Sequence, residues 1–354
     1  MTPHRCTAHV RKTFRRVAMH TPRTAAFSHA VVYHEDFAIN PLPQGHRFPM
    51  PKDALLYARL KGQGLAMATR TFRPTVPDID TISLVHDASY VQEFIQGTLS
   101  PEKQKAIGLP WSEALVRRTL VGAGSAVLAA RLATEFGIAV MCNGGTHHAH
   151  FDRGSGWCVF NDLAIAARAA QRDIGAVRKV LFADLDVHQG DGTATIFKND
   201  DSVFTLSIHC KDQPFPSQVQ KSDCDISLAA GCSDHEYMAA LESVLVRILE
   251  DFRPDLVLYN AGVDVHKDDA LGLLGLTSAG ILQRDRFVFE ACSSRNVPVA
   301  AAIGGGYEQD HEKLVDKHML LHFAAAEYAD RFLACGRSFQ AVDSNSPSLK
   351  KKNN

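Results

Sequence analysis

The stretch Val180-Leu181-Phe182-Ala183-Asp184-Leu185-Asp186-Val187-His188 decides the fold, because it runs from four apolar residues into alternating acidic, apolar and imidazole side chains. An apolar run without alternation is typical of a strand buried on both faces of a parallel sheet. In extended chain alternate side chains share a face, so we expect Asp184, Asp186 and His188 on one side. The sequence therefore predicts a buried strand that ends in a cluster of candidate metal ligands.

Further apolar runs of this kind alternate with longer helical patterns between about residues 30 and 333. The other strands are predicted at residues 30–33, 138–142, 203–208, 256–259 and 297–303. Helices are predicted at residues 52–70, 112–136, 159–170, 234–251, 278–292 and 310–332. Helices between strands supply parallel crossovers, so the predicted class is α/β, a single-domain, doubly wound, mostly parallel sheet flanked by helices.

The two ends of the chain differ from this central domain, which we place at residues 30–335. Residues 1–29 are rich in arginine and contain no acidic residue. This composition is typical of a mitochondrial or plastid transit peptide, and equally of a disordered basic leader. Residues 336–354 are polar, end in lysines and asparagines, and are predicted to be a disordered tail.

The amino-acid composition limits the binding partners and the cellular compartment that we expect for this chain. The net charge of -1 gives no reason to expect a nucleic-acid partner, and no apolar run is long enough to span a membrane. The eight cysteines are scattered without close pairs, which favours reduced thiols over disulfides or a thiolate metal site. We therefore expect an intracellular reducing compartment, which is the cytoplasm or nucleus if no transit peptide operates.

Polar residues follow four of the predicted strands, and the carboxyl ends of parallel strands meet at one edge of a sheet. Besides the opening stretch, His147-His148, Asp264 and the Gly304–Tyr307 turn reach this edge. Asp186, His188 and Asp264 would give a metal three protein ligands and an open position, as in catalytic zinc sites. An Asp/His/Asp set also suits Fe²⁺ or Co²⁺.

The adjacent imidazoles of His147 and His148 suit proton transfer near neutral pH. Asp184 and Asp191 are acids that the metal does not need, and each can orient one imidazole. Three glycines precede Tyr307, which indicates a loop pressed against a small group, with a phenol that can donate a hydrogen bond to an oxyanion.

With these residues in place, the chain resembles the histone deacetylase family within the wider arginase–deacetylase fold. The motifs that carry the resemblance follow one another in family order at residues 144–149, 153–162, 184–193, 207–209, 260–264 and 304–307. Residues 42–50 resemble the short bacterial and class IV-like branch of the family. Residues 211–222 depart from the classical histone deacetylases, which leaves the shape of the tunnel rim open.

The resemblance implies one Zn²⁺ held by Asp186, His188 and Asp264. It implies that His148, paired with Asp191, is the general base and acid, that His147 pairs with Asp184, and that Tyr307 polarises the acyl carbonyl. It implies a substrate tunnel lined by Gly156, Trp157, Phe215, Gly305 and Gly306. It also implies a structural K⁺ near Asp184, Asp186, His188 and Ser207.

The expected function is that of a zinc-dependent amidohydrolase that removes an acyl group, in the first place acetyl, from lysine in proteins. Small acylated amines such as acetylpolyamines, and long-chain acyl-lysines, are also candidate substrates because the same active-site residues serve all of them. A binuclear manganese ureohydrolase and a non-catalytic binding module are two further candidate functions. The sequence sets neither the physiological substrate nor the oligomeric state.

Overall fold

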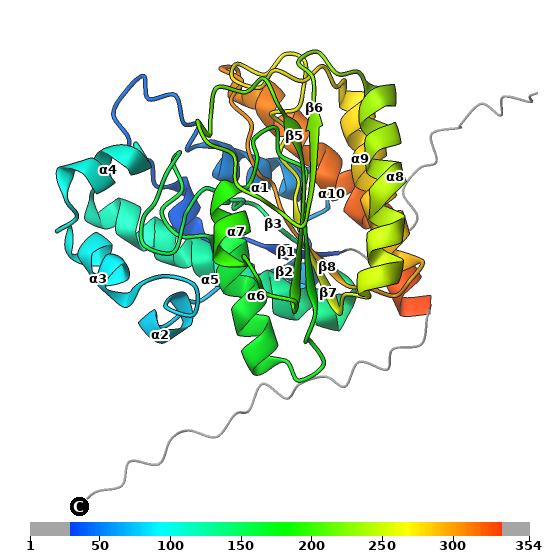
Figure 1. The fold of residues 1–354 in the computed structure, drawn as a ribbon, viewed down its shortest axis with the longest axis horizontal. Helices are drawn as coiled ribbons and strands as arrows, with labels where there is room; N and C mark the ends of the chain where they lie inside the picture. Colours follow the sequence, from blue (N-terminus) through cyan, green and yellow to red (C-terminus); the bar gives the residue numbers. More distant parts are fainter. Residues whose placement is uncertain (1–28, 335–354) are drawn as a thin grey trace, which may run out of the picture.

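The computed structural model describes residues 29–334 (Figure 1). The predicted tail at 336–354 and all but the last residue of the predicted leader lie outside the described residues, so both remain predictions. Within the described residues the chain is built around a single sheet with helices on both of its faces.

The sheet has eight strands in the order β2-β1-β3-β8-β7-β4-β5-β6, and every pair of neighbours is parallel. The strands are β1 (Ala30–Val32), β2 (Thr71–Phe72), β3 (Ile138–Met141), β4 (Val180–Asp184), β5 (Val203–Cys210), β6 (Cys224–Leu228), β7 (Leu256–Asn260) and β8 (Val299–Ala302). The predicted class is confirmed, with a sheet that is wholly parallel among the described strands.

Helices form a layer on each side of the sheet, as Figure 1 shows. One face is covered by α1 (Lys52–Gly62), α8 (Asp234–Phe252), α9 (Ser278–Ser293) and α10 (His311–Ala334). The other face is covered by α3 (Ala88–Gln96), α5 (Glu113–Phe136) and α6 (Asp162–Asp173). The shorter elements are η1 (Glu35–Ala38), η2 (Ala68–Arg70), α2 (Ile79–Ile82), α4 (Pro101–Ile107) and α7 (Asp191–Ile196).

The central strands are apolar throughout because each strand contributes to two hydrophobic cores. In β3, Ile138 and Val140 belong to the core under α8, α9 and α10, whereas Ala139 and Met141 belong to the core under α5 and α6. Successive side chains of a strand point to opposite faces, so a strand covered on both faces has no polar side. This is the physical reason that the apolar runs identified the sheet.

Four of the six predicted helices agree with the structure to within two residues at each end, and the other two differ by more. The helix predicted at 52–70 is wrong beyond Gly62, because Gly64 has a left-handed φ of 72° and the chain then enters η2 and β2. The helix predicted at 159–170 begins at Asp162, where the Asn161 side chain accepts a hydrogen bond from the backbone of Ala164 and caps the first turn.

Several short elements are absent from the prediction. The edge strand β2 has two residues, and the other edge strand, β6, alternates half-buried with exposed side chains and so lacks the apolar run of the inner strands. The helices α2, α4 and α7 have fewer than eight residues. Elements this short carry too little periodic pattern to separate them from loops.

No helix among the described residues combines the length and the apolar character needed to cross a membrane. The cysteines at described positions, which are Cys142, Cys158, Cys210, Cys224, Cys232 and Cys292, are all free thiols.

His86 joins the peripheral helices to the loop that carries the predicted catalytic histidines. Its Nδ1 lies 2.8 Å from the backbone oxygen of His150, and its Nε2 accepts a hydrogen bond of 2.9 Å from the backbone N–H of Asn161. These two partners require a neutral ring, protonated at Nδ1. Burial lowers the pKa of His86 to about 4, although the backbone oxygens of His150 and Phe151 favour the charged form.

We predict that His86 makes the fold sensitive to acid. In the unfolded chain this histidine takes up a proton near its ordinary pKa of 6.5, and in the folded chain only near 4, so unfolding binds a proton between these values. The contribution of His86 is therefore complete above pH 6.5 and is lost as the pH falls toward 4, by up to about 3 kcal/mol.

Urea unfolding at pH 7 and pH 4.5 checks this prediction. The variant His86→Gln should lose less stability between the two pH values than the parent protein does. An equal loss in both proteins would show that other groups cause the acid sensitivity.

Candidate metal centre and active site

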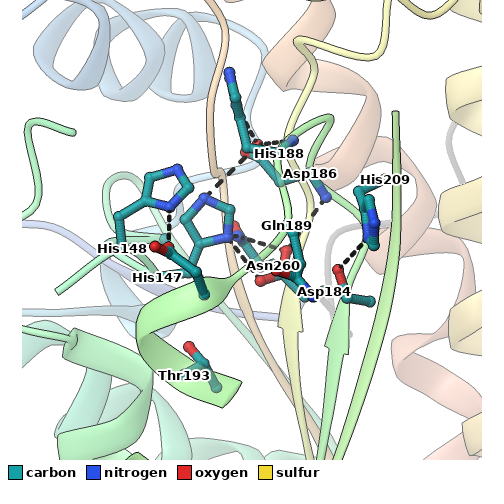
Figure 2. Close-up of polar contacts among 12 residues, drawn as sticks. His147, His148, Asp184, Asp186, His188, Gln189, Thr193, His209 and Asn260 are labelled. Carbon is teal, nitrogen blue, oxygen red and sulfur yellow. Dashed lines mark hydrogen bonds and ion pairs between the residues drawn. The ribbon is translucent and has the colours of Figure 1, made fainter. Parts of the chain in front are cut away.

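Most of the predicted site residues lie at the carboxyl ends of β3, β8, β7 and β4, which are consecutive neighbours in the sheet, or just beyond these ends. Ser207 lies in β5, and Phe215 follows β5. The strands run parallel, so the loops that follow these four strands leave the sheet at the same edge. The convergence predicted from the sequence is thus present in the structure, and Figure 2 shows His147, Asp184, Asp186 and His188 gathered there.

Asp186, His188 and Asp264 form one buried cluster, in which one atom from each residue lies within 4.8 Å of the others. The Nδ1 of His188 is 3.0 Å from Asp186 Oδ1 and 3.3 Å from Asp264 Oδ2. No other set of three histidine, cysteine or acidic side chains among residues 29–334 meets this geometry. The structure therefore brings together the three residues that the sequence suggested as metal ligands.

The cluster fits a divalent cation on two further observations. Asp264 is fully buried, yet its Oδ2 accepts no hydrogen bond. Burial, and then the neighbouring carboxylate of Asp186, raise the pKa of Asp264, because two buried negative charges repel each other. A cation between the two carboxylates would remove this penalty and give the free oxygen a partner.

Two glycines let the backbone approach the carboxylates closely. A Cβ on Gly305 would lie 2.1 Å from Asp264 Oδ2, and a Cβ on Gly262 would lie 2.4 Å from Asp186 Oδ2. The backbone N–H of Gly305 donates a 2.9 Å hydrogen bond to Asp186 Oδ2. The glycine-rich turn after β8 therefore holds one ligand in place, and side chains larger than hydrogen are excluded there.

His147 pairs with Asp184, as predicted, through 2.7 Å between Nδ1 and Oδ2. Asn260 donates a 3.0 Å hydrogen bond to the other oxygen of Asp184 (Figure 2). Burial disfavours a charge on His147, but the carboxylates of Asp184 and Asp186 outweigh it and raise the pKa to about 9. The two neighbouring carboxylates thus favour the charged form of His147.

His148 pairs with Asp191, also as predicted, through 2.6 Å between Nδ1 and Oδ1. His150 Nε2 lies 3.3 Å from the second oxygen of this carboxylate. Burial, and then the positive charge of His147, lower the pKa of His148 to about 3. The pKa values of the two adjacent imidazoles are therefore shifted in opposite directions, which favours His148 as the neutral ring of the pair.

The loop that carries the histidines is fixed by the start of α6. Asp162 accepts hydrogen bonds of 2.9 and 3.0 Å from the backbone N–H groups of Gly145 and Thr146. Asn161 donates to the backbone oxygen of Ala149 at 3.3 Å. The glycine turn before the histidines is thus tied to a buried acid.

Tyr307 lies beside a cavity of about 120 Å³ that His147, His148 and Asp186 also line. Its ring centroid is 5.3 Å from that of Trp157 and 6.3 Å from that of His188, and its backbone N–H donates 2.7 Å to Asp269. Burial, and then Asp264, raise the pKa of Tyr307, so the phenol keeps its proton and remains a hydrogen-bond donor.

The residues predicted for the tunnel divide into two groups. Gly156, Trp157 and Gly305 line the cavity, whereas Phe215 and Gly306 are not among its lining residues. Phe215 nevertheless faces Gly156, where a Cβ would lie 2.6 Å from the phenyl ring, and its ring centroid is 4.7 Å from that of His148. A Cβ on Gly306 would instead meet Val263 and Leu314 in the core.

Ser207, which the sequence placed near a potassium ion, is buried in β5 and pairs in register with Asp184. Its hydroxyl lies 3.0 Å from His209 Nδ1.

Sequence reasoning assigned no role to several residues that hold the site. Asn260 and Asp162 lie inside the quoted motifs, so their position was a usable signal. Lys52 begins α1, and its ammonium donates a 2.8 Å hydrogen bond to the backbone oxygen of Gly304. Nothing in the sequence near Lys52 indicates this contact, because its partner lies 252 positions away.

Fold and site together define a class of protein: a parallel α/β domain whose sheet edge carries a buried three-residue candidate metal centre beside paired acid–base groups. The histone deacetylase domain family matches residues 46–322. The chain belongs to the histone deacetylase family, and it is accordingly a hydrolase of the deacetylase type.

Individual relatives agree with this assignment. The chain is 48% identical over 297 residues to an uncharacterized protein of Picosynechococcus sp., covering 84% of this chain and 98% of that protein. It is 34% identical over 194 residues to histone deacetylase 2 of Arabidopsis thaliana, covering 54% of this chain and 50% of that protein. It is 30% identical over 263 residues to a probable deacetylase of Methanothermobacter thermautotrophicus, covering 69% and 76%.

The fold is also that of a solved structure, an HDAC homologue complexed with SAHA. The TM-score is 0.73 at 22% sequence identity, and the match covers 86% of this chain and 87% of the other.

We predict that Asp264→Asn loses the metal. The variant keeps the shape of the side chain but removes a charge from the three-residue cluster, so a divalent ion is no longer neutralised by two carboxylates. Metal analysis after loading with Zn²⁺ and dialysis should find little metal in the variant and near-stoichiometric metal in the parent. Asp268→Asn, at an exposed neighbour, should bind as the parent does. Full retention in Asp264→Asn would exclude this residue as a ligand.

Proposed function

We propose that the chain is a zinc-dependent hydrolase that removes an acyl group, in the first place acetyl, from the side-chain nitrogen of lysine in proteins. The observation that carries the proposal is the Asp186–His188–Asp264 cluster with the His148–Asp191 pair and Tyr307 at the same site. Asp186 of this cluster, His148 and Tyr307 line one cavity, and a metal ligand, a base and a phenol donor are groups that amide hydrolysis needs.

Zinc is the proposed ion because the family is generally zinc-dependent and because a catalytic zinc takes three nitrogen or oxygen ligands and keeps one position open. Fe²⁺ and Co²⁺ suit the same donors. When bound, the ion would act as a Lewis acid toward water and the acyl carbonyl.

The residues of the chain would move the protons. The neutral His148 would take a proton from the attacking water at Nε2, while Asp191 holds Nδ1 and stabilises the charged ring. The phenol of Tyr307 would donate to the acyl oxygen as negative charge develops there. His148 would then return its proton to the departing amine, which restores the neutral base.

A structural K⁺ near Asp184, Asp186, His188 and Ser207 is part of the proposal. The register of β4 with β5, which sets Asp184 beside Ser207, supports it, since a potassium ion needs several oxygen atoms close together.

The cavity supports a short acyl group over a long one. Its volume is about 120 Å³, and buried Lys52, Asp53 and Arg118 are among the lining residues. An extended apolar chain placed against these charged groups would cost free energy. An acetylated small amine carries the same acetyl group as acetyl-lysine, so such amines stay a second candidate class of substrate.

Two further functions have less support. A binuclear manganese ureohydrolase needs more acidic ligands, and the described residues provide one cluster of three. A binding module that has lost catalysis would lack a ligand or the phenol, and both are in place.

We predict that Tyr307→Phe lowers kcat by about 10²–10³, the usual effect of removing one oxyanion donor. The phenyl ring keeps the packing against Trp157, so metal content and thermal stability should match the parent. Tyr328→Phe, in α10, serves as the control and should be fully active. Turnover of Tyr307→Phe at the parental rate would refute the role of the phenol.

A substrate panel tests the proposed function itself. We expect the zinc-loaded protein to hydrolyse acetyl-lysine peptides faster than acetylpolyamines or longer acyl-lysines, and a hydroxamate to inhibit it. Faster hydrolysis of an acetylpolyamine would replace protein lysine with small amines as the substrate class. Failure to hydrolyse any acylated amine would end the proposal.

A further inference from the structure

Gln213 touches the candidate metal ligand His188 from the segment between β5 and β6, which is the part of the chain that departs from the classical family. Its side-chain nitrogen lies 3.1 Å from His188 Nε2 and donates a 2.9 Å hydrogen bond to the backbone oxygen of Leu271. Its side-chain oxygen, Oε1, is buried and has no hydrogen-bond partner. An orphaned buried oxygen beside a metal ligand calls for an explanation.

The two nitrogens of His188 face different groups. Nδ1 faces the carboxylates of Asp186 and Asp264, so Nδ1 is the atom that a cation between them would bind. Nε2 faces Gln213. A neutral imidazole carries one proton, and metal binding at Nδ1 uses the lone pair there, so the proton must sit on Nε2.

A protonated Nε2 needs an acceptor, because the ring is buried. The nitrogen of the Gln213 amide cannot accept, but its unpartnered Oε1 can. A rotation of the Gln213 amide that brings Oε1 to Nε2 would give both of these atoms a hydrogen-bond partner, in place of the present contact between the amide nitrogen and Nε2. In the structure the same side chain links the segment of His188 to the loop that follows Asp264, through the hydrogen bond to the backbone oxygen of Leu271.

We propose that Gln213 is a positioning residue for the metal centre: its side-chain oxygen accepts the Nε2 proton of His188 and so fixes the tautomer and the ring orientation in which Nδ1 binds the ion. The inference rests on the proposed metal centre. A hydrogen-bond partner on the second nitrogen of a ligating histidine typically contributes 10- to 100-fold to metal affinity.

The test compares variants of the full chain by chelator competition for Zn²⁺ and by the absorption spectrum of the Co²⁺-loaded protein. Gln213→Leu has a similar size but no acceptor, so its Zn²⁺ affinity should fall about 10- to 100-fold and its Co²⁺ spectrum should shift. Gln213→Glu restores an acceptor oxygen and should recover the affinity to within a few-fold. Gln218→Leu, at an exposed position of the same segment, should match the parent.

Each outcome bears on one claim. Parental Zn²⁺ affinity and an unchanged Co²⁺ spectrum in Gln213→Leu would overturn the role of Gln213 while leaving the metal centre intact. A parent protein that binds neither ion would instead overturn the metal centre, and the inference with it. If Gln213→Leu fails to fold, Gln213→Ala removes the same acceptor without adding apolar bulk and must show the same loss.

Discussion

The arrangement of the site depends on two carboxylates, Asp186 and Asp264, buried side by side at the ends of neighbouring strands. Two buried negative charges are stable only when a cation compensates them and hydrogen-bond donors contact their oxygens. The backbone supplies donors, since Gly305 N–H binds Asp186 and Val187 N–H binds Asp264. The close approach of these backbone groups explains why glycine occupies the turn after β8.

The buried carboxylates of the site also affect two adjacent histidines differently. The carboxylates of Asp184 and Asp186 raise the pKa of His147. His148 is paired with Asp191, and its ring centroid lies 4.0 Å from that of His147, whose positive charge lowers the pKa of His148. Two imidazolium ions at this distance would repel each other, so the charge settles on the ring with more carboxylates around it. The two histidines of one sequence motif thus have pKa values that are shifted in opposite directions.

The sequence was sufficient for the parts of the fold that repeat a strong pattern. The inner strands, buried on both faces, are continuous apolar runs, and polar residues at their ends predicted where Asp186 and Asp264 meet. The edge strands β2 and β6 were not predicted, because β2 has only two residues and β6 is only half-buried. The contacts of Lys52 and Gln213 with the site were not predicted for another reason. Their partners are distant in the chain, and only the folded structure brings them together.

The segment between β5 and β6 shows how the surroundings of such a site can change while its ligands stay. Gln220 donates a 2.6 Å hydrogen bond from its backbone to the side chain of Gln189, next to His188, and Phe215 packs on His148. This segment contacts the residue next to the candidate ligand His188 and the proposed base His148. It can therefore influence both residues, although it supplies no ligand and no base itself. Motifs therefore predict the chemistry of this chain more closely than its specificity, because the residues that shape access to the site belong to a segment that the motifs do not include.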